Sequence, residues 1–372
     1  MPLPSVILTL AFWVIGILLM SRIPSLSSAE ERPEPSDEEP QTRISVVIPA
    51  RNEAQRIAPL LASLRLQSLP SHEIIVVDDH STDSTAAVAH QHGARVIASQ
   101  ALPETWTGKT WACWQGAKVA TGELLLFLDA DTWLEPHAVK QLVGAWGRAG
   151  GLVTVQPYHV TVKPYEQLSA FFNIVSMAGL NAFTPLGASL RPGGAFGACM
   201  ACSRRDYHTI GGHAAVKAAV LEDLLVARLF FRRGLPVTCY GGKGAISFRM
   251  YPAGLGALVE GWSKSFASGA MAIRPFALVL TLGWVMGCFS TTSRLLQSLG
   301  EPLIPSLAAS LAIYFLYALQ ILWILRRIGK FKWYTCLLFP VPLVFFALVS
   351  LHSLVAIHVL RRVTWRGRTI ET

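Results

Sequence analysis

Three short apolar runs each end in a cluster of polar residues, and this pattern limits the folds open to the chain. The runs are Ile44–Ile48, Ile74–Val77 and Leu124–Leu128. Nearly continuous apolar runs of this length are typical of strands that are covered on both faces of a parallel sheet. Glu53–Leu69 lies between the first and second runs, and its apolar residues are close to helical spacing. Asp83–His92 follows the second run and can also begin a helix. The sequence therefore predicts an α/β fold built from strand–helix–strand units.

The polar clusters are expected to meet at one edge of this sheet. Ligands of open parallel sheets bind beyond the carboxyl ends of the strands, and the three clusters are Pro49–Glu53, Asp78–Asp79 and Asp129–Asp131. Carboxylates gathered there would repel one another without a cation or a donor-rich ligand. The Asp-x-Asp pair, Asp129 and Asp131, supplies oxygen ligands suited to Mg²⁺ or Mn²⁺ that carries a diphosphate. Taken alone, this pair also fits a solvated turn.

With these motifs in this order, the stretch from Ile44 to about Arg249 resembles the family 2 inverting glycosyltransferases. The resemblance implies a GT-A nucleotide-sugar-binding domain with a mostly parallel central sheet flanked by helices, and a UDP-sugar as donor. It also implies that Asp129 contacts the nucleotide and that Asp131 holds the metal. Further donor-binding positions follow at the first two strand ends: Pro49, Arg51, Glu53, Asp78 and Asp79.

A second acidic pair, Glu222 and Asp223, opens the helical pattern LEDLLVARLFFRRG. The family keeps its general base at this motif, so the resemblance implies that Asp223 is the base, with Glu222 beside it. Inverting transfer needs one carboxylate to accept the proton of the attacking group. If the acceptor is itself a carboxylate, Asp223 would mainly position it. Helix capping is the alternative role, because acidic residues are favoured in a first helical turn.

A Trp-x-Gly-Lys loop at Trp106–Lys109 narrows the resemblance. Glycine permits a close backbone approach, and Lys109 is predicted to reach a donor phosphate or a site carboxylate. An ordinary surface lysine beside a packed indole is the alternative. The loop is similar to that of membrane-bound enzymes that glycosylate carotenoid acids and of the related hopanoid-associated transferases.

Composition places part of the chain in lipid. The 372 residues are 52% hydrophobic and 15% charged, with a mean hydropathy of +0.42, which is too apolar for an ordinary soluble enzyme. Val6–Met20 is predicted to be an uncleaved membrane anchor within residues 1–22, although a signal peptide is an alternative for so short a segment. Residues 23–43 are rich in Pro, Ser and Glu and predict a flexible linker.

The catalytic domain is predicted to span residues 44–272, and a membrane domain with a basic tail residues 273–372. The membrane domain holds three apolar segments, Phe276–Thr292, Leu303–Leu325 and Trp333–Leu360. We expect a multi-pass protein of the cell (inner) membrane whose catalytic domain is cytoplasmic, because nucleotide sugars are made there.

The basic residues give conflicting signals about topology. Arg22 and the basic residues of Arg326–Lys332 fit the cytoplasmic side. A full crossing by the last segment would then place Arg361–Arg368 outside, which is unfavourable. Pro340 and Pro342 are predicted to break that segment into a re-entrant hairpin.

The net charge of +9 does not indicate nucleic-acid binding. The basic residues cluster at predicted membrane borders, which suits anionic lipid head groups, and no nucleic-acid-binding motif accompanies them. The six cysteines form neither a disulfide framework nor a zinc site, since Cys199-x-x-Cys202 has no second pair. They are predicted to be reduced thiols.

Residues on either side of the second acidic pair are candidates for the acceptor half of the site. The glycines of Arg191–Cys202 would leave room for a bulky group, and His213 either touches an acceptor or lies in a plain surface turn. Trp262 and Lys264 stand where processive relatives keep Gln-x-x-Arg-Trp, and the departure from that motif favours a single sugar transfer. Both are predicted to cover the diphosphate or to sit at the lipid interface.

The sequence therefore predicts an inverting glycosyltransferase that moves a sugar, with glucose first among the candidates, from a UDP-sugar to a lipid-like acceptor such as a carotenoid carboxylate or hydroxyl. A hopanoid-associated or polyprenyl-phosphate glycosyltransferase is the alternative within the class. An inactive membrane scaffold is the alternative outside it, and the intact set of Asp79, Asp129, Asp131 and Asp223 argues against it. A transporter is disfavoured because the apolar segments hold few ionisable residues.

Overall fold

The computed structural model describes residues 3–26, 42–187, 191–219, 221–269, 275–300, 304–358, 362–365 and 368–371. The chain divides into two compact units. The sheet unit consists of Pro24–Tyr158 and Gly194–Arg249. The helical unit consists of Met1–Ile23, His159–Gly193 and Met250–Thr372.

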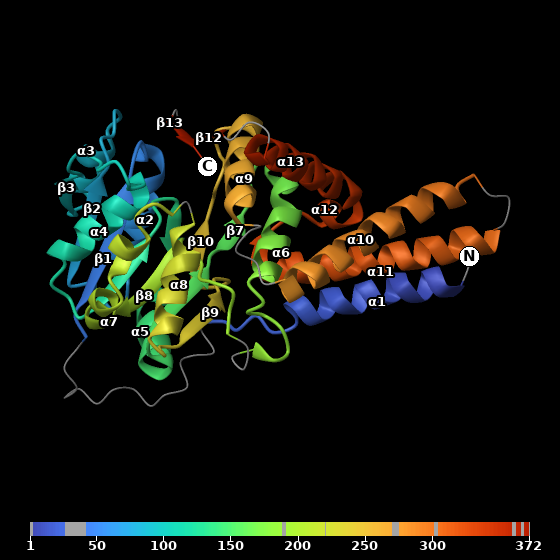
Figure 1. The fold of residues 1–372 in the computed structure, drawn as a ribbon, viewed down its shortest axis with the longest axis horizontal. Coiled ribbons are helices and arrows are strands. Elements are labelled where there is room, and N and C mark those ends of the chain that lie inside the picture. Colours follow the sequence, from blue (N-terminus) through green and yellow to red (C-terminus); the bar gives the residue numbers. More distant parts are fainter. Residues whose placement is uncertain are drawn as a thin grey trace. The chain divides into compact units, whose positions relative to one another are not determined.

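A seven-stranded sheet organises the sheet unit, in the order β3-β2-β1-β4-β8-β6-β9 (Figure 1). β8 runs antiparallel to both of its neighbours, and the other pairs within this sheet are parallel. The mostly parallel sheet predicted from the sequence is therefore confirmed. Its strands are β1 (Ile44–Ala50), β2 (Glu73–Asp78), β3 (Arg95–Ala98), β4 (Leu124–Leu128), β6 (Leu152–Gln156), β8 (Cys199–Ser203) and β9 (Val237–Gly241).

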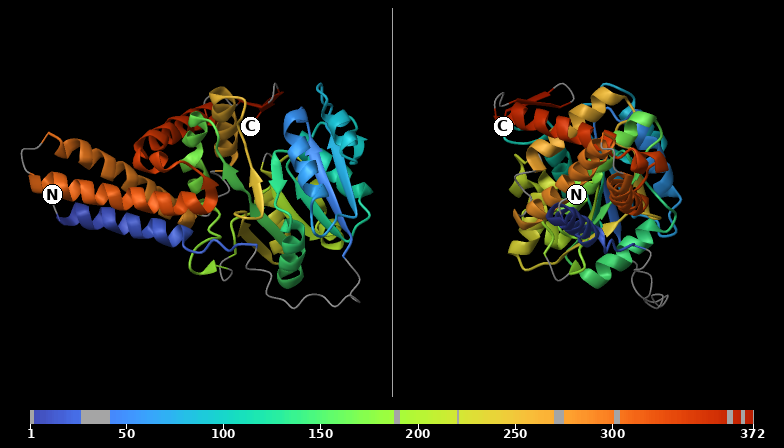
Figure 2. Two further views of the ribbon diagram at one scale, coloured as in Figure 1. Left: turned by 180° about the vertical axis from the view of Figure 1, so that it is seen from behind. Right: turned by 90° about the vertical axis from the view of Figure 1, so that its right-hand side faces the viewer.

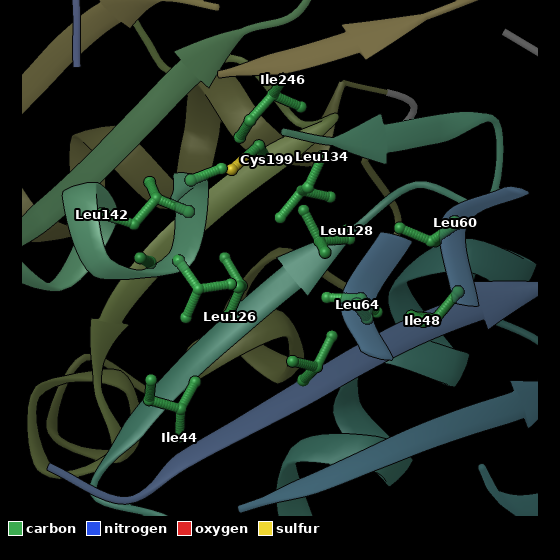
Figure 3. Close-up of a cluster of buried hydrophobic side chains, with 14 of the residues drawn as sticks. Ile44, Ile48, Leu60, Leu64, Leu126, Leu128, Leu134, Leu142, Cys199 and Ile246 are labelled. Carbon is green, nitrogen blue, oxygen red and sulfur yellow. The ribbon is translucent and has the colours of Figure 1, made fainter. Parts of the chain in front are cut away.

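The central strands are buried on both faces, which explains why their sequences are apolar without alternation. In β4, Leu124, Leu126 and Leu128 belong to one hydrophobic cluster, whereas Leu125 and Phe127 belong to another. Figure 3 shows the first cluster, where Leu126 and Leu128 of β4 lie near Ile48 of β1. Because both clusters exclude water, β1 and β4 form a rigid base for the residues that follow them.

Helices cover each face of this sheet. The first cluster includes side chains from α2 (Ala54–Arg65), α3 (Thr85–Gln91) and α5 (Ala138–Ala149). The second includes side chains from α4 (Gly108–Val119), α7 (Arg204–Thr209), the 3₁₀-helix η4 (Gly212–Val216) and α8 (Glu222–Arg232). A short antiparallel pair, β5 (Thr132–Leu134) and β10 (Ile246–Phe248), follows the end of β4.

Three long helices lie side by side in the helical unit, in the views of both Figure 1 and Figure 2. They are α1 (Leu3–Met20), α10 (Pro275–Ser298) and α11 (Ile304–Ile328). Polar contacts connect them: Gln320 Nε2 donates to the carbonyl of Trp13 at 2.6 Å, and Trp284 Nε1 donates to Gln320 Oε1 at 2.8 Å. The N-terminal segment is thus part of the bundle, and its retention as a membrane anchor stays a prediction.

Two of these helices have the length and apolar composition of membrane spans, namely Pro275–Ser298 and Ser306–Ile328. Pro4–Met20 and Pro340–Val355 are shorter apolar helices. Large apolar side chains remain exposed on both spans, including Val279 at 66% and Leu319 at 62%. Such exposure is expected of lipid-facing positions rather than of the core of a soluble protein.

The last predicted segment, Trp333–Leu360, is divided in the structure into α12 (Trp333–Leu337) and α13 (Pro340–His358). Pro340 opens α13 and Pro342 lies in its first turn, where proline is tolerated because no helical hydrogen bond needs its nitrogen. The prolines therefore begin a helix, and the break comes just before them. The tail contains the hairpin β12 (Arg362–Trp365) and β13 (Arg368–Glu371).

Shorter elements pack against α13 in the same unit. They are η2 (Pro164–Ser169), α6 (Ala170–Gly179) and α9 (Leu255–Gly269). Two residues of β7 (Tyr158–Val160), His159 and Val160, pair with β11 (Gly329–Lys330). Residues 159–193 and 250–269 thus belong with the apolar helices, whereas the sequence assigned them to one continuous domain of residues 44–272.

The predicted linker of residues 23–43 falls largely on residues 27–41, outside the described residues. Its first part is not a linker, because Leu26 is fully buried in the sheet unit and Gly241 of β9 donates to the carbonyl of Pro24 at 2.9 Å. All six cysteines are free and buried. Cys199 and Cys202 belong to different hydrophobic clusters, so they do not form a paired site.

Candidate active site

The end of β4 places two carboxylates at the edge of the sheet. Asp129 follows Leu128, and its backbone N–H donates to the carbonyl of Ala198 at 3.1 Å. The hydroxyl of Thr132 donates to the carbonyl of Asp129 at 2.8 Å, which closes a turn. The side chains of Asp129 and Asp131 are 32% and 21% exposed. The turn therefore fixes the backbone while both carboxylates remain accessible to a ligand.

Lys109 joins this turn to the second acidic pair. Its Nζ lies 2.9 Å from Asp129 Oδ1 and 3.0 Å from Glu222 Oε1. Thr107 caps the helix that carries it, because Thr107 Oγ1 accepts from the backbone N–H of Thr110. Burial lowers the pKa of Lys109, but the charges of Asp129 and Glu222 outweigh burial and raise the pKa well above its ordinary value. Lys109 is therefore a permanent cation between two carboxylates and not a surface lysine.

Glu222 and Asp223 begin α8 but have different surroundings. Burial raises the pKa of Glu222, but Lys109 and His213 outweigh burial and hold the pKa below its ordinary value. Burial and the charge of Glu222 raise the pKa of Asp223 to about 7. Each oxygen of Asp223 accepts a backbone N–H, Oδ2 from Gly197 and Oδ1 from Leu224, both at 2.9 Å. Among the residues that the structure describes, Glu222 therefore forms an ion pair with a lysine and Asp223 forms none.

Gly194 and Gly197 leave space for the start of α8. A Cβ at Gly197 would lie 3.0 Å from Asp223 Oδ2, and one at Gly194 would lie 2.1 Å from Leu224 Cδ2. From the sequence, this space was expected to admit a bulky acceptor group. In the structure Asp223 and Leu224 fill it.

The loops after β1 and β2 are joined to each other. Arg51 Nη1 lies 3.5 Å from Asp79 Oδ2. Asn52, at φ 54°, accepts the backbone N–H of Thr82 on its side-chain oxygen at 2.8 Å. Asp83 accepts the N–H of Ala54 at 3.1 Å, so it connects the starts of α2 and α3. These contacts bring the predicted residues of both loops together.

Three further predicted donor-binding residues lie at the same strand ends. Pro49 is in β1, in register with Val77 of β2. Glu53 is buried, and its Oε2 forms an ion pair with Arg56 Nε at 2.6 Å. Asp78 ends β2, and its Oδ1 is buried with no hydrogen-bond partner among the described residues. A ligand group that donates a hydrogen bond would satisfy this oxygen.

The residues at the end of β4 fit a divalent cation. Carboxylate oxygens are the ligands that Mg²⁺ and Mn²⁺ prefer. Burial and the charge of Asp129 raise the pKa of Asp131 to about 7, against the opposing charge of Arg56, and a cation would relieve this repulsion. No group of three His, Cys, Asp or Glu side chains within the described part of the chain forms a complete metal cage. The remaining ligands would therefore come from substrate or water.

The sheet unit has the strand-end acids and the second acidic pair of a known enzyme family. A model of the family "Glycosyl transferase family 2" matches residues 45–208. The chain is 37% identical over 360 residues to the 4,4'-diaponeurosporenoate glycosyltransferase of Staphylococcus haemolyticus, covering 95% of this chain and 94% of that enzyme. This chain belongs to glycosyltransferase family 2. A second family 2 relative, the Staphylococcus aureus enzyme of the same name, is 34% identical and covers 87% of each chain.

The family 2 assignment agrees with a solved structure that has the same fold. The mannosyltransferase PcManGT from Pyrobaculum calidifontis, determined with GDP-mannose and Mn²⁺, aligns with a TM-score of 0.56 at 19% identity. The alignment covers 93% of this chain and 97% of that one. The predicted GT-A fold is thus confirmed.

Two predicted site residues of this family 2 enzyme lie in the helical unit. The indole of Trp262 is 4% exposed and stacks on Phe172, with ring centroids 4.8 Å apart. Trp262 Nε1 donates to Ser169 Oγ at 3.1 Å. Trp262 therefore holds α9 against η2 and α6, and its predicted contact with a diphosphate stays a prediction. The side chain of Lys264 lies outside the described residues.

Three features of the site were not predicted from the sequence. Arg56 Nη1 lies 4.0 Å from Asp131 Oδ2, so a second cation faces the strand-end acids. Gly197 holds Asp223 through its backbone, and His213 is fully buried instead of lying in a surface turn. For Arg56 there was a weak sequence signal, because the acid Glu53 lies three residues before Arg56. The other two depend on contacts between distant segments.

Proposed function

We propose that the protein transfers a sugar from a UDP-sugar to the carboxylate of a carotenoid acid, with inversion at the anomeric carbon. Two observations support the acceptor class. Relatives that match nearly the whole chain are named diaponeurosporenoate glycosyltransferases. The chain also carries helices of the length and composition of membrane spans, which suit an enzyme that meets its acceptor in lipid. We propose glucose as the transferred sugar.

In this proposal the first two loops and the turn after β4 bind the donor. The loops with Arg51, Asp78 and Asp79 would hold the nucleoside, where the free Oδ1 of Asp78 can accept a hydrogen bond. Asp129 and Asp131 would hold Mg²⁺ or Mn²⁺, which as a Lewis acid stabilises negative charge on the leaving diphosphate. Lys109 would add a fixed positive charge on the same side.

One observation carries the inverting mechanism. Glu222 is neutralised by Lys109 at 3.0 Å, so Asp223 is the member of the acidic pair that can act on an acceptor. Inversion by a single displacement needs one such group, because the acceptor attacks while the diphosphate leaves from the opposite face. A covalent intermediate would instead need one free carboxylate as the nucleophile and a second group to assist its transfer to the acceptor.

A carboxylate acceptor fits an Asp223 whose pKa is about 7. The acceptor carboxylate is ionised at neutral pH and needs no base. An ionised Asp223 would repel it, whereas a protonated Asp223 donates a hydrogen bond to it and sets its direction of attack. With a hydroxyl acceptor, the ionised form of the same residue would serve as the base.

The charges at one end of the helix bundle support a cytoplasmic site. Arg327 Nη1 donates to the carbonyl of Met20 at 2.6 Å, so the end of α11 lies beside the end of α1. Further basic residues lie at or just after the C-terminal ends of these two helices: Arg22, Arg326, Lys330 and Lys332. By the positive-inside rule this end faces the cytoplasm. The sheet unit begins directly after it, at Pro24.

The test is release of UDP by the full-length protein in detergent, with a panel of UDP-sugars, with Mn²⁺ or chelator, and with or without diaponeurosporenoic acid. We expect release that needs metal, rises with the acceptor and is lost in Asp131→Asn and Asp223→Asn. Glu104→Gln, at an exposed position, is the matched carboxylate control and should behave as wild type. UDP release that does not rise with any lipid acceptor would refute the carotenoid proposal. Absence of nucleotide binding would refute the proposed sugar transfer itself.

A further inference from the structure

Thr154 places a hydroxyl in a strand whose neighbouring side chains are apolar. It lies in β6, which has the sequence LVTVQ, and it is fully buried. A buried hydroxyl costs free energy unless it makes hydrogen bonds, so packing alone would favour valine at such a position. Its neighbours Val153 and Val155 belong to the first hydrophobic cluster. The alternation of a strand therefore places Thr154 on the other face of the sheet, which α8 helps to cover.

The hydroxyl of Thr154 holds the loop before β8 both as an acceptor and as a donor. Its Oγ1 accepts the backbone N–H of Phe196 at 2.8 Å. Its proton can be donated to the carbonyl of Phe196, at 2.8 Å, or to that of Cys199, at 3.1 Å. The backbone N–H of Cys199 donates to the carbonyl of Phe196 at 3.4 Å, which closes a turn. One side chain therefore contacts both ends of the turn Phe196–Cys199.

The two residues inside this turn are bonded to the two halves of the candidate site. The backbone N–H of Gly197 donates to Asp223 Oδ2 at 2.9 Å. The carbonyl of Ala198 accepts the backbone N–H of Asp129 at 3.1 Å. Asp129 and Asp223 are distant in sequence, and adjacent residues of one short turn connect them. The turn is therefore a hydrogen-bonded link between the end of β4 and the start of α8.

We propose that Thr154 is a positioning residue that sets the spacing between Asp129 and Asp223 through this turn. The inference rests on the proposed function, in which Asp129 serves the donor and Asp223 the acceptor. Thr154 touches no substrate in this role. In a single displacement the acceptor attacks opposite the departing diphosphate, so the relative placement of the two substrates affects the rate more than the binding of either one.

Two substitutions separate the hydrogen bonds of Thr154 from its packing. Valine has nearly the same shape but leaves the N–H of Phe196 without the acceptor that Thr154 supplies. Serine keeps the hydroxyl and loses only a methyl group. A residue that only fills the core should therefore tolerate valine better than serine, and a residue that holds the turn should show the opposite order.

Hydrogen exchange of single backbone amides, read by mass spectrometry, tests the link without any substrate. The full-length protein in detergent is compared with Thr154→Val and Thr154→Ser. In Thr154→Val the amides of Phe196, Gly197 and Asp129 should each exchange about tenfold faster, as the loss of one hydrogen bond predicts. In Thr154→Ser they should keep wild-type protection. Amides of β1, in the centre of the sheet, report on global unfolding and should not change.

Three results of this experiment would overturn the proposal. Faster exchange at Phe196 alone would show that the turn does not transmit the position of Thr154 to either acid. Equal loosening in the serine variant would show that the hydroxyl is not what matters. An equal rise in β1 would show a general loss of stability. Thr238→Val, at a half-buried threonine on the neighbouring strand β9, is the matched control and should leave these amides unchanged.

The wild-type protein provides a second measurement if Thr154→Val does not fold. The amides of Phe196, Gly197 and Asp129 should then open as one unit in wild type, with equal opening free energies and the same dependence on low concentrations of urea. Openings that differ between Gly197 and Asp129 would contradict a rigid link between the two acids.

Activity gives an independent outcome. If the protein transfers sugar, Thr154→Val should lower kcat about tenfold and leave the KM for the UDP-sugar nearly unchanged, and Thr154→Ser should restore most of the kcat. A loss that appears only in KM would contradict the positioning role. A wild-type protein that forms no product would refute the proposed function and leave the exchange result standing, so the two failures are distinguishable.

Thr154 and Gly197 should also be coupled, because both act on Asp223 through the same turn. The double variant Thr154→Val/Gly197→Ala should lose less activity than the product of the two single losses. Single losses that simply multiply would show that the two residues act independently and would count against the proposal.

Discussion

Gly197 holds the carboxylate of Asp223 through its backbone N–H, with 2.9 Å between the nitrogen and Oδ2. A side chain at this position would push Asp223 away, because a Cβ would lie 3.0 Å from Oδ2 and 3.2 Å from the Asp223 Cγ. The proposed base is therefore placed by the main chain of the loop before β8. Its position depends on a glycine that is distant from it in sequence.

Gly197→Ala should lower kcat/KM by about tenfold to a hundredfold, since displacing a catalytic group by a fraction of an ångström costs this much. UDP-sugar binding should change less than kcat/KM, because the added Cβ would meet Asp223 and not the side chains proposed to hold the donor. The measurement is UDP release beside donor affinity by calorimetry.

Gly147→Ala is the matched control for that substitution. No atom lies within 4 Å of a Cβ at Gly147, which is inside α5. Alanine there should leave activity unchanged and stabilise the helix slightly. An equal loss of donor binding and of kcat in Gly197→Ala would show a general disturbance of the site instead of a displaced base.

Removal of the Lys109 charge should destabilise the protein and stop the reaction. Lys109→Met leaves Glu222, whose side chain is 6% exposed, without its cation. Because the lysine is 35% exposed, loss of one partner is expected to cost about 2 kcal/mol, less than in a fully buried pair. The double variant Lys109→Met/Glu222→Gln should regain most of the stability and none of the activity, since the donor would still lack the lysine.

Thermal unfolding and UDP release measured on the same preparations check this cycle. Lys118→Met, at an exposed lysine on the same helix, is the control and should be neutral. If the second substitution restored nothing, the two side chains would not be coupled as the 3.0 Å distance indicates.

The pH dependence of transfer should have opposite signs for the two kinds of acceptor. The pKa of Asp223 is raised to about 7, so the residue is mostly protonated below that pH and ionised above it. With a carboxylate acceptor, kcat/KM should fall up to tenfold per pH unit above 7, because the hydrogen-bond donor is lost. With a hydroxyl acceptor it should rise through the same range, because the base forms.

Initial rates with a carotenoid acid and with its alcohol, measured from pH 5.5 to 8.5, check this prediction. Asp223→Asn should lose activity with both acceptors. Each carboxyl oxygen accepts a backbone N–H, and an amide nitrogen in either place would face a donor. Parallel profiles for acid and alcohol would contradict the assignment of Asp223.

Patterns within a single segment predicted the parts of the site that lie on strands. Leu124–Leu128 is apolar because β4 is buried on both faces, so its end, and with it Asp129, could be located from sequence. Lys109 was predicted to reach a phosphate or a carboxylate, and the structure places it at two carboxylates. These features can be predicted from local composition, because the end of a strand or helix fixes where the adjoining residues lie.

Contacts between distant segments could not be predicted in this way. The partner of Gly197 is 26 residues away, and the burial of His213 depends on packing between α4 and α8. Residues 159–193 were predicted to belong to the catalytic domain because of their place in the chain, yet they pack with the apolar helices. Apolar composition alone does not say whether a helix faces a sheet or a bundle.

Gln320 should be needed for the attachment of α1 to the bundle. Its side chain is 3% exposed and joins the carbonyl of Trp13 to Trp284 Nε1. Gln320→Leu keeps the volume but removes both hydrogen bonds and leaves the indole N–H of Trp284 without a partner. Polar contacts between membrane helices contribute about 1 kcal/mol each, so the melting midpoint in detergent should fall by a few degrees. Leu319→Met, on the exposed face of α11, should not change it.

The same preparations report on the fate of α1, because an anchor that is part of the bundle keeps an N-terminal tag through purification. A mature protein that has lost the tag and begins after Met20 would show that α1 is a cleaved signal and that these contacts do not persist.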